Sequence, residues 1–539
     1  MTRPRMQTIA TLSCVLLTVT LASTACAPLS TPTPATQLTA TVAPTQAAPT
    51  VTPEPAERGE LSVGFVEVAA GHLDPMKAVA PPLIVVYPAF SDALMRLDVE
   101  TGELEPTLAV SWEHIDERTL EVKLRQGVKF HNGEDFDANA VKFSFERALD
   151  PDLALSITSR VQNVTDVTVV DRYTVRIGTE EPDPLLLKRL TALYMVPPKY
   201  VAEVGESEFG MHPVGTGPFR LVRHLPGQEI VFEAWDEGWR GPPKLERLTF
   251  VSLPEDAARV SALLAGDVDL IYAVPPDQAD RLQEAGRVVE YSPKGHVYML
   301  RFDWMTCDCP LEDKRVRQAI NYAIDKEALI EHLFSGMTEE TPGQFFLPFA
   351  FGFNPDIEPY PYDPQEARAL LAEAGYTNGF EARMMTTDGR VLLDKALAEA
   401  LAGYLEDVGI RTQIDVVESA EYISHFHNPD SRKRGLVNSV WAYLPILDPE
   451  FALIWNVCSQ PRKLHCDPKF DEVFIESQTE MDPVKRRLLL QKAIAVMREN
   501  PPAAFLFAVP DIYAFKSEVE GVKPRPDGLL WFEEIEVLP

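Results

Sequence analysis

The sequence predicts an α/β protein, because segments with strand spacing alternate with segments with helix spacing from Glu60 to the C-terminal end. Two helix starts carry an Asp-Pro pair, at Asp363-Pro364 and Asp482-Pro483, where Asp caps the helix and Pro takes the first helical position. Glycine ends two helical segments, at Gly375 and Gly409. These signals recur along the body of the chain, and no internal repeat of fixed period is present.

The expected helices follow in order along the second half of the chain. Apolar side chains at helical spacing predict an amphipathic helix over residues 315–334. The helix after Asp363 ends at Gly375, and residues 392–408 form the next one. Residues 411–417 then have strand spacing, and the helix after Asp482 extends to about Asn500, where two prolines stop it.

The N-terminal segment predicts export. Arg3 and Arg5 precede an apolar run, Ile9–Leu21, that is too short to span a bilayer and suits the core of a signal peptide. Small residues and then Cys26 follow, which resembles the bacterial lipoprotein signal. We expect a signal peptide over residues 1–25 and lipidation of Cys26; the alternative is a plain secretory signal cut near Ala25.

Residues 26–59 are expected to form a disordered linker behind that anchor. Pro, Thr and Ala dominate the segment, and such a composition buries too little apolar surface to offset its ordering entropy. No other stretch has the length of apolar sequence that a membrane helix needs. The expected location is the outer face of the cytoplasmic membrane, or the periplasm, with the chain held by its lipid.

The charge balance excludes one class of partner. Lys and Arg number 50 against 81 Asp and Glu, which gives a net charge of −31. A surface this acidic repels phosphate backbones, so we expect no nucleic-acid binding.

Four cysteines remain for the folded body: Cys307, Cys309, Cys458 and Cys466. In an exported chain this even number predicts two disulfides, with three possible connectivities. Cys458–Cys466 with Cys307–Cys309 is the simplest set, and cross-pairing stays open because the second pair is close in sequence.

No sequence pattern points to catalysis or a cofactor. The chain has no G-x-S-x-G, H-E-x-x-H, G-x-x-x-x-G-K-[ST] or G-x-G-x-x-G motif. Gly215-Thr216-Gly217-Pro218 suits a tight turn rather than a phosphate cradle. His425, His427, His465 and Cys466 match no strong metal-ligand spacing, so we expect neither metal nor cofactor.

The order of several long segments resembles the bacterial family 5 extracellular solute-binding proteins, the peptide, nickel and opine type of binding subunit of ABC importers. The segments that carry the resemblance are Leu73–Pro75, Leu108–Pro151, Val214–Trp239, Leu263–Gln278, Arg315–Leu329 and Tyr362–Tyr376. It covers residues 60–539.

The resemblance implies a two-lobed periplasmic-binding-protein fold with a hinge and an extra domain on the first lobe. Residues 60–91, 211–301 and 509–539 would form the first-lobe core, residues 92–210 the appended domain, and residues 302–508 the second lobe. The chain would cross between lobes near Phe302-Asp303 and near Ala508–Asp511. A solute would be enclosed between the lobes.

The resemblance also suggests which residues touch the solute. Relatives that bind peptides carry a W-x-A-D-Y-x-D-P segment whose first Asp pairs with the peptide ammonium group; here Trp441, Tyr443 and Asp448 remain, while Leu444 stands at the ammonium-binding position. We expect stacking on Trp441 and Tyr443 with Asp448 nearby. Further candidates are Asp388 and Arg390 in the loop before residue 392, Tyr87 beside Asp92, and Asp303 with Trp304.

The expected function is therefore a lipid-anchored receptor that binds a small organic solute, oligopeptide-like or oligosaccharide-like, and delivers it to ABC permease and ATPase subunits. It would act as a monomer and not as an enzyme. A ligand sensor on the same fold and an exported hydrolase are the alternatives; neighbouring permease genes and turnover of the ligand would distinguish them.

Overall fold

The structure is a computed structural model, and it describes residues 58–68, 71–77, 83–305, 309–428, 435–442, 446–461 and 463–538. The predicted signal peptide, Cys26 and the linker up to residue 57 lie outside these ranges, as do Cys307, Tyr443 and Leu444. The side chains of Trp441 and Ala442 are also not described.

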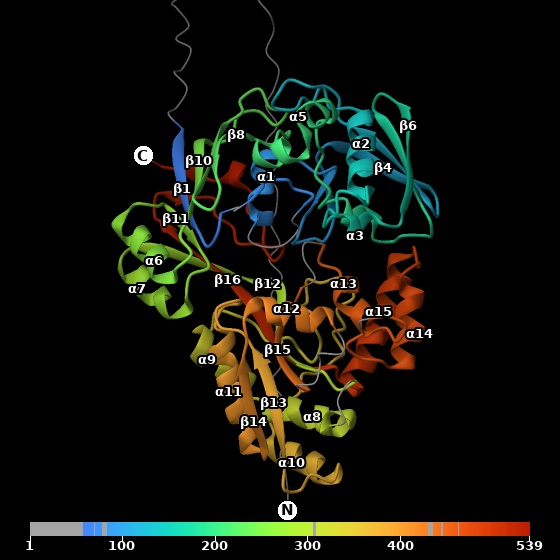
Figure 1. The fold of residues 1–539 in the computed structure, drawn as a ribbon, viewed down its shortest axis with the longest axis vertical. Coiled ribbons are helices and arrows are strands. Elements are labelled where there is room, and N and C mark those ends of the chain that lie inside the picture. The colour runs from blue at the N-terminus through green and yellow to red at the C-terminus, as the bar shows by residue number, and fades with distance from the viewer. Residues whose placement is uncertain are drawn as a thin grey trace, which may run out of the picture. The chain divides into compact units, whose positions relative to one another are not determined.

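A mixed sheet forms the centre of the described part of the chain (Figure 1). Its ten strands, from one edge to the other, are β14 (Ile410–Val416), β13 (Phe380–Thr386), β15 (Gly435–Ala442), β12 (Arg287–Phe302), β16 (Ala503–Lys516), β11 (Leu270–Tyr272), β1 (Gly59–Phe65), β10 (Leu245–Ser252), β9 (Glu229–Ala234) and β8 (Phe219–Leu225). Parallel pairs join β14, β13 and β15 at one end, and β11, β1 and β10 near the other. The two lobes therefore share one sheet.

The two long strands β12 and β16 are the connection between the lobes. Their antiparallel pairing extends from Arg287↔Lys516 to Arg301↔Ala503, with an irregularity between Pro293 and Val297. β12 pairs with β15 only from His296 onward. On β16, the strand pairing changes around Pro510.

A separate four-stranded antiparallel sheet lies within residues 92–210, in the order β4 (Ala109–Asp116), β5 (Thr119–Leu124), β7 (Thr174–Thr179) and β6 (Val164–Asp171). Helix α2 (Ala138–Leu149) starts at Asp137, whose side chain accepts a hydrogen bond from the Asn139 N–H. The other helices here are α3 (Thr158–Val161), α4 (Leu186–Arg189) and α5 (Pro198–Met211). Their apolar side chains form one core with the sheet, around Phe130, Val141 and Phe145.

Gly215 and Gly217 form the turn by which the chain returns from these residues to the central sheet. A Cβ on Gly215 would lie 2.1 Å from the Phe90 carbonyl oxygen, and one on Gly217 would lie 2.5 Å from the Phe90 carbonyl carbon. The main chain can approach this closely only without side chains. The glycines thus serve packing against α1 (Tyr87–Phe90), as the turn interpretation requires.

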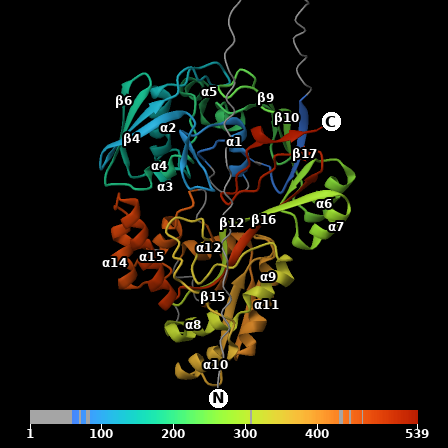
Figure 2. The ribbon, with the colours of Figure 1, turned by 180° about the vertical axis from the view of Figure 1, so that it is seen from behind.

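Helices cover the second-lobe end of the sheet. They are α8 (Lys314–Ala323), α9 (Lys326–Phe334), α10 (Pro364–Glu373), α11 (Asp394–Asp407), α12 (Ser419–His427), α13 (Glu450–Leu453), α14 (Pro468–Ser477) and α15 (Pro483–Glu499). The last two lie side by side at the edge of this lobe (Figure 2). The predicted caps Asp363 and Asp482 each accept two backbone N–H bonds at the start of α10 and α15.

The single helix predicted over 315–334 is wrong, because the structure has two helices that meet at Ile324-Asp325. Ile324 is extended, and the Asp325 side chain accepts a hydrogen bond from the Ala328 N–H, which makes it the cap of α9. Apolar residues keep helical spacing through the break because both helices pack on the same core. Smaller elements complete the fold: α6 (Asp256–Ala265), α7 (Ala279–Glu284), and the strand pairs β2 (Met95–Leu97) with β3 (Leu104–Pro106) and β17 (Val519–Glu520) with β18 (Glu536–Val537).

Candidate functional site

A pocket on the second lobe lies between α12 and α13, and we call it the α12–α13 pocket. It holds about 660 Å³ of empty space, including its open mouth. Its lining residues come from α12, from β15, from α13 and the turn after it, and from the loop before α11: Arg390, Tyr422, Ile423, Phe426, His427, Ser439, Val440, Phe451 and Trp455. Trp441 follows Val440 on β15, so the predicted stacking residue is the chain neighbour of a pocket wall.

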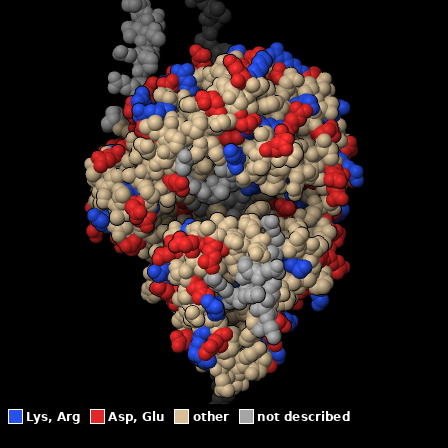
Figure 3. Space-filling view, viewed as in Figure 1, with Lys and Arg blue, Asp and Glu red and all other residues tan. Residues whose placement is uncertain are grey.

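The pocket belongs to the part of the second lobe that meets the first. Glu450, the residue before Phe451, forms an ion pair with Arg189 of α4 at 3.4 Å. Lys188 of the same helix lies 5.0 Å from the ring centre of Phe351 in the second lobe. Figure 3 shows this face hollowed between its upper and lower parts. These contacts bring α4 against Glu450 and Phe351, beside the pocket.

Helix α12 is fixed to the sheet by two polar contacts on its inner side. The Tyr422 hydroxyl lies 2.7 Å from the Ser439 hydroxyl, and His425 Nε2 donates to the Asp303 carboxylate at 2.8 Å. Arg301 donates twice to the same carboxylate, at 2.8 and 3.0 Å. Burial opposes the charge of Asp303, yet Arg301 and His425 lower its pKa to about 2. Asp303 therefore fixes α12, which forms one wall of the pocket, on the side of the helix that faces the sheet.

The backbone of the loop from Thr386 to Arg390 is bound to a carboxylate of the protein itself. The Asp394 carboxylate accepts from Gly389 N–H at 2.9 Å and from Val391 N–H at 3.3 Å, so these groups already have an anionic partner. Asp388 is exposed and pairs with Lys395 at 3.0 Å. Arg390 is exposed, and its guanidinium lies 4.6 Å from the Tyr422 ring centre. Arg390 is thus the member of this loop that reaches the pocket.

Asp448 has a partner inside the protein. Its side chain is fully buried, and its two oxygens accept from Arg486 at 2.7 and 2.9 Å. Burial opposes ionisation, but the charge and hydrogen bonds of Arg486 lower the pKa of Asp448. Both carboxylate oxygens of Asp448 are therefore engaged by Arg486.

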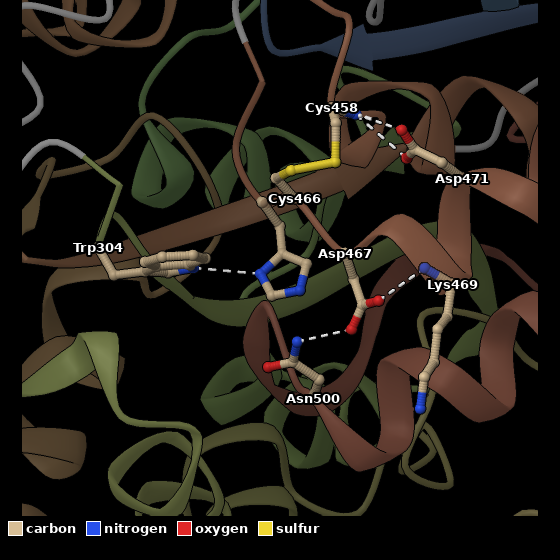
Figure 4. Close-up of a disulfide and its surroundings, with 8 residues drawn as sticks. Trp304, Cys458, Cys466, Asp467, Lys469, Asp471 and Asn500 are labelled. Atoms are coloured by element: carbon tan, nitrogen blue, oxygen red, sulfur yellow. Dashed lines mark hydrogen bonds between the residues drawn. A yellow bond between two sulfur atoms is a disulfide. The ribbon is translucent and has the colours of Figure 1, made fainter.

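Trp304 and the Cys458–Cys466 disulfide lie close together, on either side of His465 (Figure 4). Trp304 donates from Nε1 to His465 Nδ1 at 3.1 Å, and the guanidinium of Arg317 lies 5.0 Å from the Trp304 ring. Burial, with the nearby Arg317, lowers the pKa of His465 to about 3. Cys309 is also disulfide-bonded, while Cys307 lies outside the described residues. These contacts give Trp304 a packing role in the structure.

A second cavity lies in the first lobe and contains Tyr87 and Asp92 in its wall. The Asp92 carboxylate accepts hydrogen bonds from Thr216, Trp239 and Arg240 at 2.6 to 3.0 Å, so both of its oxygens already have partners within the protein. Tyr87 is 1% exposed, its hydroxyl has no hydrogen-bond partner among the described residues, and burial raises its pKa.

The sequence did not single out the α12–α13 pocket. Tyr422 and Phe426 stand four residues apart on α12, a spacing that alone cannot distinguish a pocket wall from a core face. Phe451 and Trp455 belong to short helical turns with no periodic signal. Within the described ranges, no cluster of three or more acidic, His or Cys side chains could hold a metal ion, and none of the helices could cross a bilayer.

Two lobes joined by two strands, with a pocket on the second lobe beside the Glu450–Arg189 contact, define a solute-binding protein of the hinged type. Residues 103–461 match the family described as bacterial extracellular solute-binding proteins, family 5, middle region, and the chain belongs to this family. It is the extracytoplasmic substrate-binding protein of an ABC importer, and members of the family are transport binding proteins without catalytic activity.

Similar proteins agree with this assignment. The chain is 29% identical over 479 residues to the glutathione-binding protein GsiB of Pectobacterium atrosepticum, covering 86% of this chain and 92% of that protein. Among solved structures, NikA of Brucella suis in complex with Fe(III)-EDTA has a TM-score of 0.79 and 25% identity, over 89% and 99% of the two chains. CtaP of Listeria monocytogenes, at 18% identity, shares the fold with a TM-score of 0.81, over 90% and 100%.

Proposed function

We propose that this protein is a lipid-anchored receptor, held through Cys26, that encloses one small organic solute between its lobes and presents it to its permease. The solute would lie on the second lobe against Trp441, Tyr443 and the rim residue Arg390. The α12–α13 pocket supports the proposal, because it adjoins Trp441 and lies beside Glu450, which pairs with Arg189 of α4.

Solute chemistry follows from Leu444. A leucine at the ammonium-binding position offers no counter-charge, and an unpaired buried cation costs several kcal/mol (order of magnitude). Asp448 could take the place of the ammonium-binding Asp only by breaking its ion pair with Arg486. The solute should therefore be gripped by stacking and hydrogen bonds, which favours an N-blocked peptide, an amide-rich oligomer or an oligosaccharide over a free dipeptide.

Closure would take place about β12 and β16, where both strands change neighbours, with Pro293 paired to Pro510. We propose with it a first-lobe core of residues 60–91, 211–301 and 509–539, an appended domain of residues 92–210, and a second lobe of residues 302–508. For closure to follow binding, the solute must contact both lobes, so that the closed form binds it more tightly than the open form.

The binding test is a calorimetric titration of the unliganded protein with free dipeptides, N-acetylated peptides, oligosaccharides and glutathione, for which some relatives are named. Trp441→Ala should weaken binding about tenfold, the loss expected for one stacked aromatic. Tight binding of free dipeptides that ignores Trp441→Ala would contradict the site and the solute preference.

The anchoring test is Cys26→Ala. This variant should appear in the soluble fraction, whereas the native chain should stay with the membrane and carry a lipid mass on its first residue. A variant that stays with the membrane, or a native N-terminus without modification, would contradict the anchor.

A further inference from the structure

Helix α15 carries a positive charge in a strongly acidic protein. Its 17 residues include five Lys or Arg and a single acidic residue, whereas the chain as a whole has a net charge of −31. One of these cations, Arg486, is buried and paired inside the protein. Lys485, Arg487 and Lys492 are exposed, and none of the three forms an ion pair with a carboxylate in the part of the chain that the structure describes. These cations are therefore available to an anionic partner.

The exposed face of α15 also carries apolar side chains. Val484 is 66% exposed and Leu488 is 51% exposed, and the exposed Ala495 lies on the same side of the helix. The opposite side, with Leu490 and Ile494, is buried in the core of the second lobe, so the orientation of the helix is fixed. Neighbouring apolar side chains in water favour contact with an apolar partner.

The cations flank this apolar stripe. Because a helix turns by about 100° per residue, Lys485 and Lys492 lie on one side of Val484 and Leu488, and Arg487 lies on the other side. An apolar centre with cationic borders is typical of helices that lie in the interface of a membrane. Lys and Arg have apolar stems, so their charges reach lipid phosphates while the stripe contacts the acyl chains. Helix α15 lies at the edge of the second lobe, where a flat surface can approach it (Figure 1).

The net charge of the protein opposes such a contact only at long range. At physiological ionic strength the Debye length is about 8 Å, so charges farther than this from the contact are largely screened. Glu472 and Glu476 on the neighbouring helix α14 are exposed as well, which confines the contact to α15. Lipid phosphates supply many anions in one plane above an apolar layer, so a single partner satisfies both the cations and the apolar stripe.

We infer that the exposed face of α15 lies on the anionic lipid surface of the membrane that holds the protein. The inference goes beyond solute binding and uses only the proposed location of the protein. A lipid tether keeps the body near the membrane at a high effective concentration, so a weak contact is sufficient. Val484 and Leu488 enter the interface, and Lys485, Arg487 and Lys492 contact lipid phosphates. The contact orients the second lobe relative to the membrane.

The test is co-sedimentation with lipid vesicles at millimolar lipid and physiological salt. The protein is the chain from residue 26 onward with Cys26→Ala, so that neither the signal peptide nor a lipid contributes. One set of vesicles is phosphatidylcholine alone, and the other is equal parts of phosphatidylcholine and phosphatidylglycerol. All variants share this background, which makes their partition coefficients directly comparable.

Two pairs of variants separate charge from apolar contact. The charge variant is Lys485→Gln with Lys492→Gln. Its control is Lys199→Gln with Lys314→Gln, which removes two exposed lysines from α5 and α8. The apolar variant is Val484→Ser, and its control is Val222→Ser on β8, where the valine is 52% exposed. All of these side chains are exposed, so urea unfolding should be the same for every variant.

The unsubstituted α15 should bind the anionic vesicles more tightly than phosphatidylcholine vesicles, and the difference should shrink as salt is added. The charge variant should lower the partition coefficient for anionic vesicles at least about tenfold, because each Lys near such a surface contributes about fivefold. Val484→Ser should lower it severalfold. Both control variants should leave it unchanged.

Equal binding to the two kinds of vesicle, or binding to neither, would overturn the inference. Binding to anionic vesicles that survives the charge variant would also overturn it. If only membranes that contain the permease retain the protein, and do so through Lys485 and Lys492, the face is a protein contact and the lipid surface is wrong. These outcomes leave solute binding standing, because calorimetry tests it without lipid. A native N-terminus without modification would contradict the anchor alone, since the vesicles measure the α15 contact by itself.

Discussion

The buried pair of Asp448 and Arg486 should contribute strongly to stability, and Asp448→Asn tests this. Both side chains are at most 3% exposed, and two hydrogen bonds of 2.7 and 2.9 Å join them. The asparagine keeps an acceptor but removes the counter-charge of Arg486, and Lys188 nearby adds a second positive charge. Removing one partner of a buried pair costs about 3–5 kcal/mol, and we expect the lower end, about 3 kcal/mol, because one hydrogen bond remains.

The assay is urea unfolding followed by circular dichroism at neutral pH, with Asp388→Asn as the matched control. Asp388 pairs with Lys395 at a similar distance but is exposed, so its loss should cost only about 0–1 kcal/mol. An Asp448→Asn protein as stable as the control, with weakened solute binding, would refute this reasoning and return Asp448 to the solute site.

The pH dependence of the same pair has a definite sign. Arg486 lowers the pKa of Asp448 in the folded state, so the pair stabilises the protein at pH values above the ordinary carboxylate range. That stabilisation is lost as the pH falls through the lowered pKa. Asp448→Asn should therefore lose stability less steeply in acid than the wild-type protein.

Three further predictions concern the lobe contact, α12 and the disulfide. Burial raises the pKa of Glu450; Asp448 and Asp183 add to this rise, whereas Arg189 and Arg486 oppose it. Protonation of Glu450 should therefore favour the closed form as the pH falls. Glu450→Gln should abolish this pH-dependent closure, measured by small-angle scattering. His425→Ala should remove one hydrogen-bond donor to Asp303 and lower the free energy of unfolding by about 1–3 kcal/mol. It should also speed amide hydrogen exchange in α12, and unchanged exchange would contradict the role of His425 in holding α12 on the sheet. Replacing Cys458 and Cys466 together by serine should lower the free energy of unfolding by about 2–3 kcal/mol, measured by urea unfolding. A loss below about 1 kcal/mol would contradict this expectation.

Local signals in the sequence predicted most of the elements. The caps Asp363 and Asp482 were found because an Asp-Pro start acts through neighbouring residues, and the structure has both. The break at Ile324-Asp325 was missed because apolar spacing records which face is buried, and both helices bury the same face. The Cys458–Cys466 disulfide is the simplest pairing expected from the cysteine spacing, and the structure has it.

The candidate site was harder to predict, because it depends on partners far apart in sequence. Arg486 pairs with Asp448 from another helix, and Ser439 holds Tyr422 from a strand. No local pattern in a single sequence reports such partners. The resemblance to relatives pointed to the segment around Trp441, which adjoins the α12–α13 pocket, while the contacts of each side chain came only from the structure.

The position of β16 has a consequence for biogenesis. This strand, residues 503–516, lies between β12 and β11, so the central sheet is incomplete until almost the last part of the chain is present. A chain that emerges from a translocation channel with its N-terminal end first must then keep exposed strand edges on both lobes until β16 arrives. Folding of the two lobes is thereby linked to completed secretion, and truncation before β16 should leave an unfolded, protease-sensitive product rather than one intact lobe.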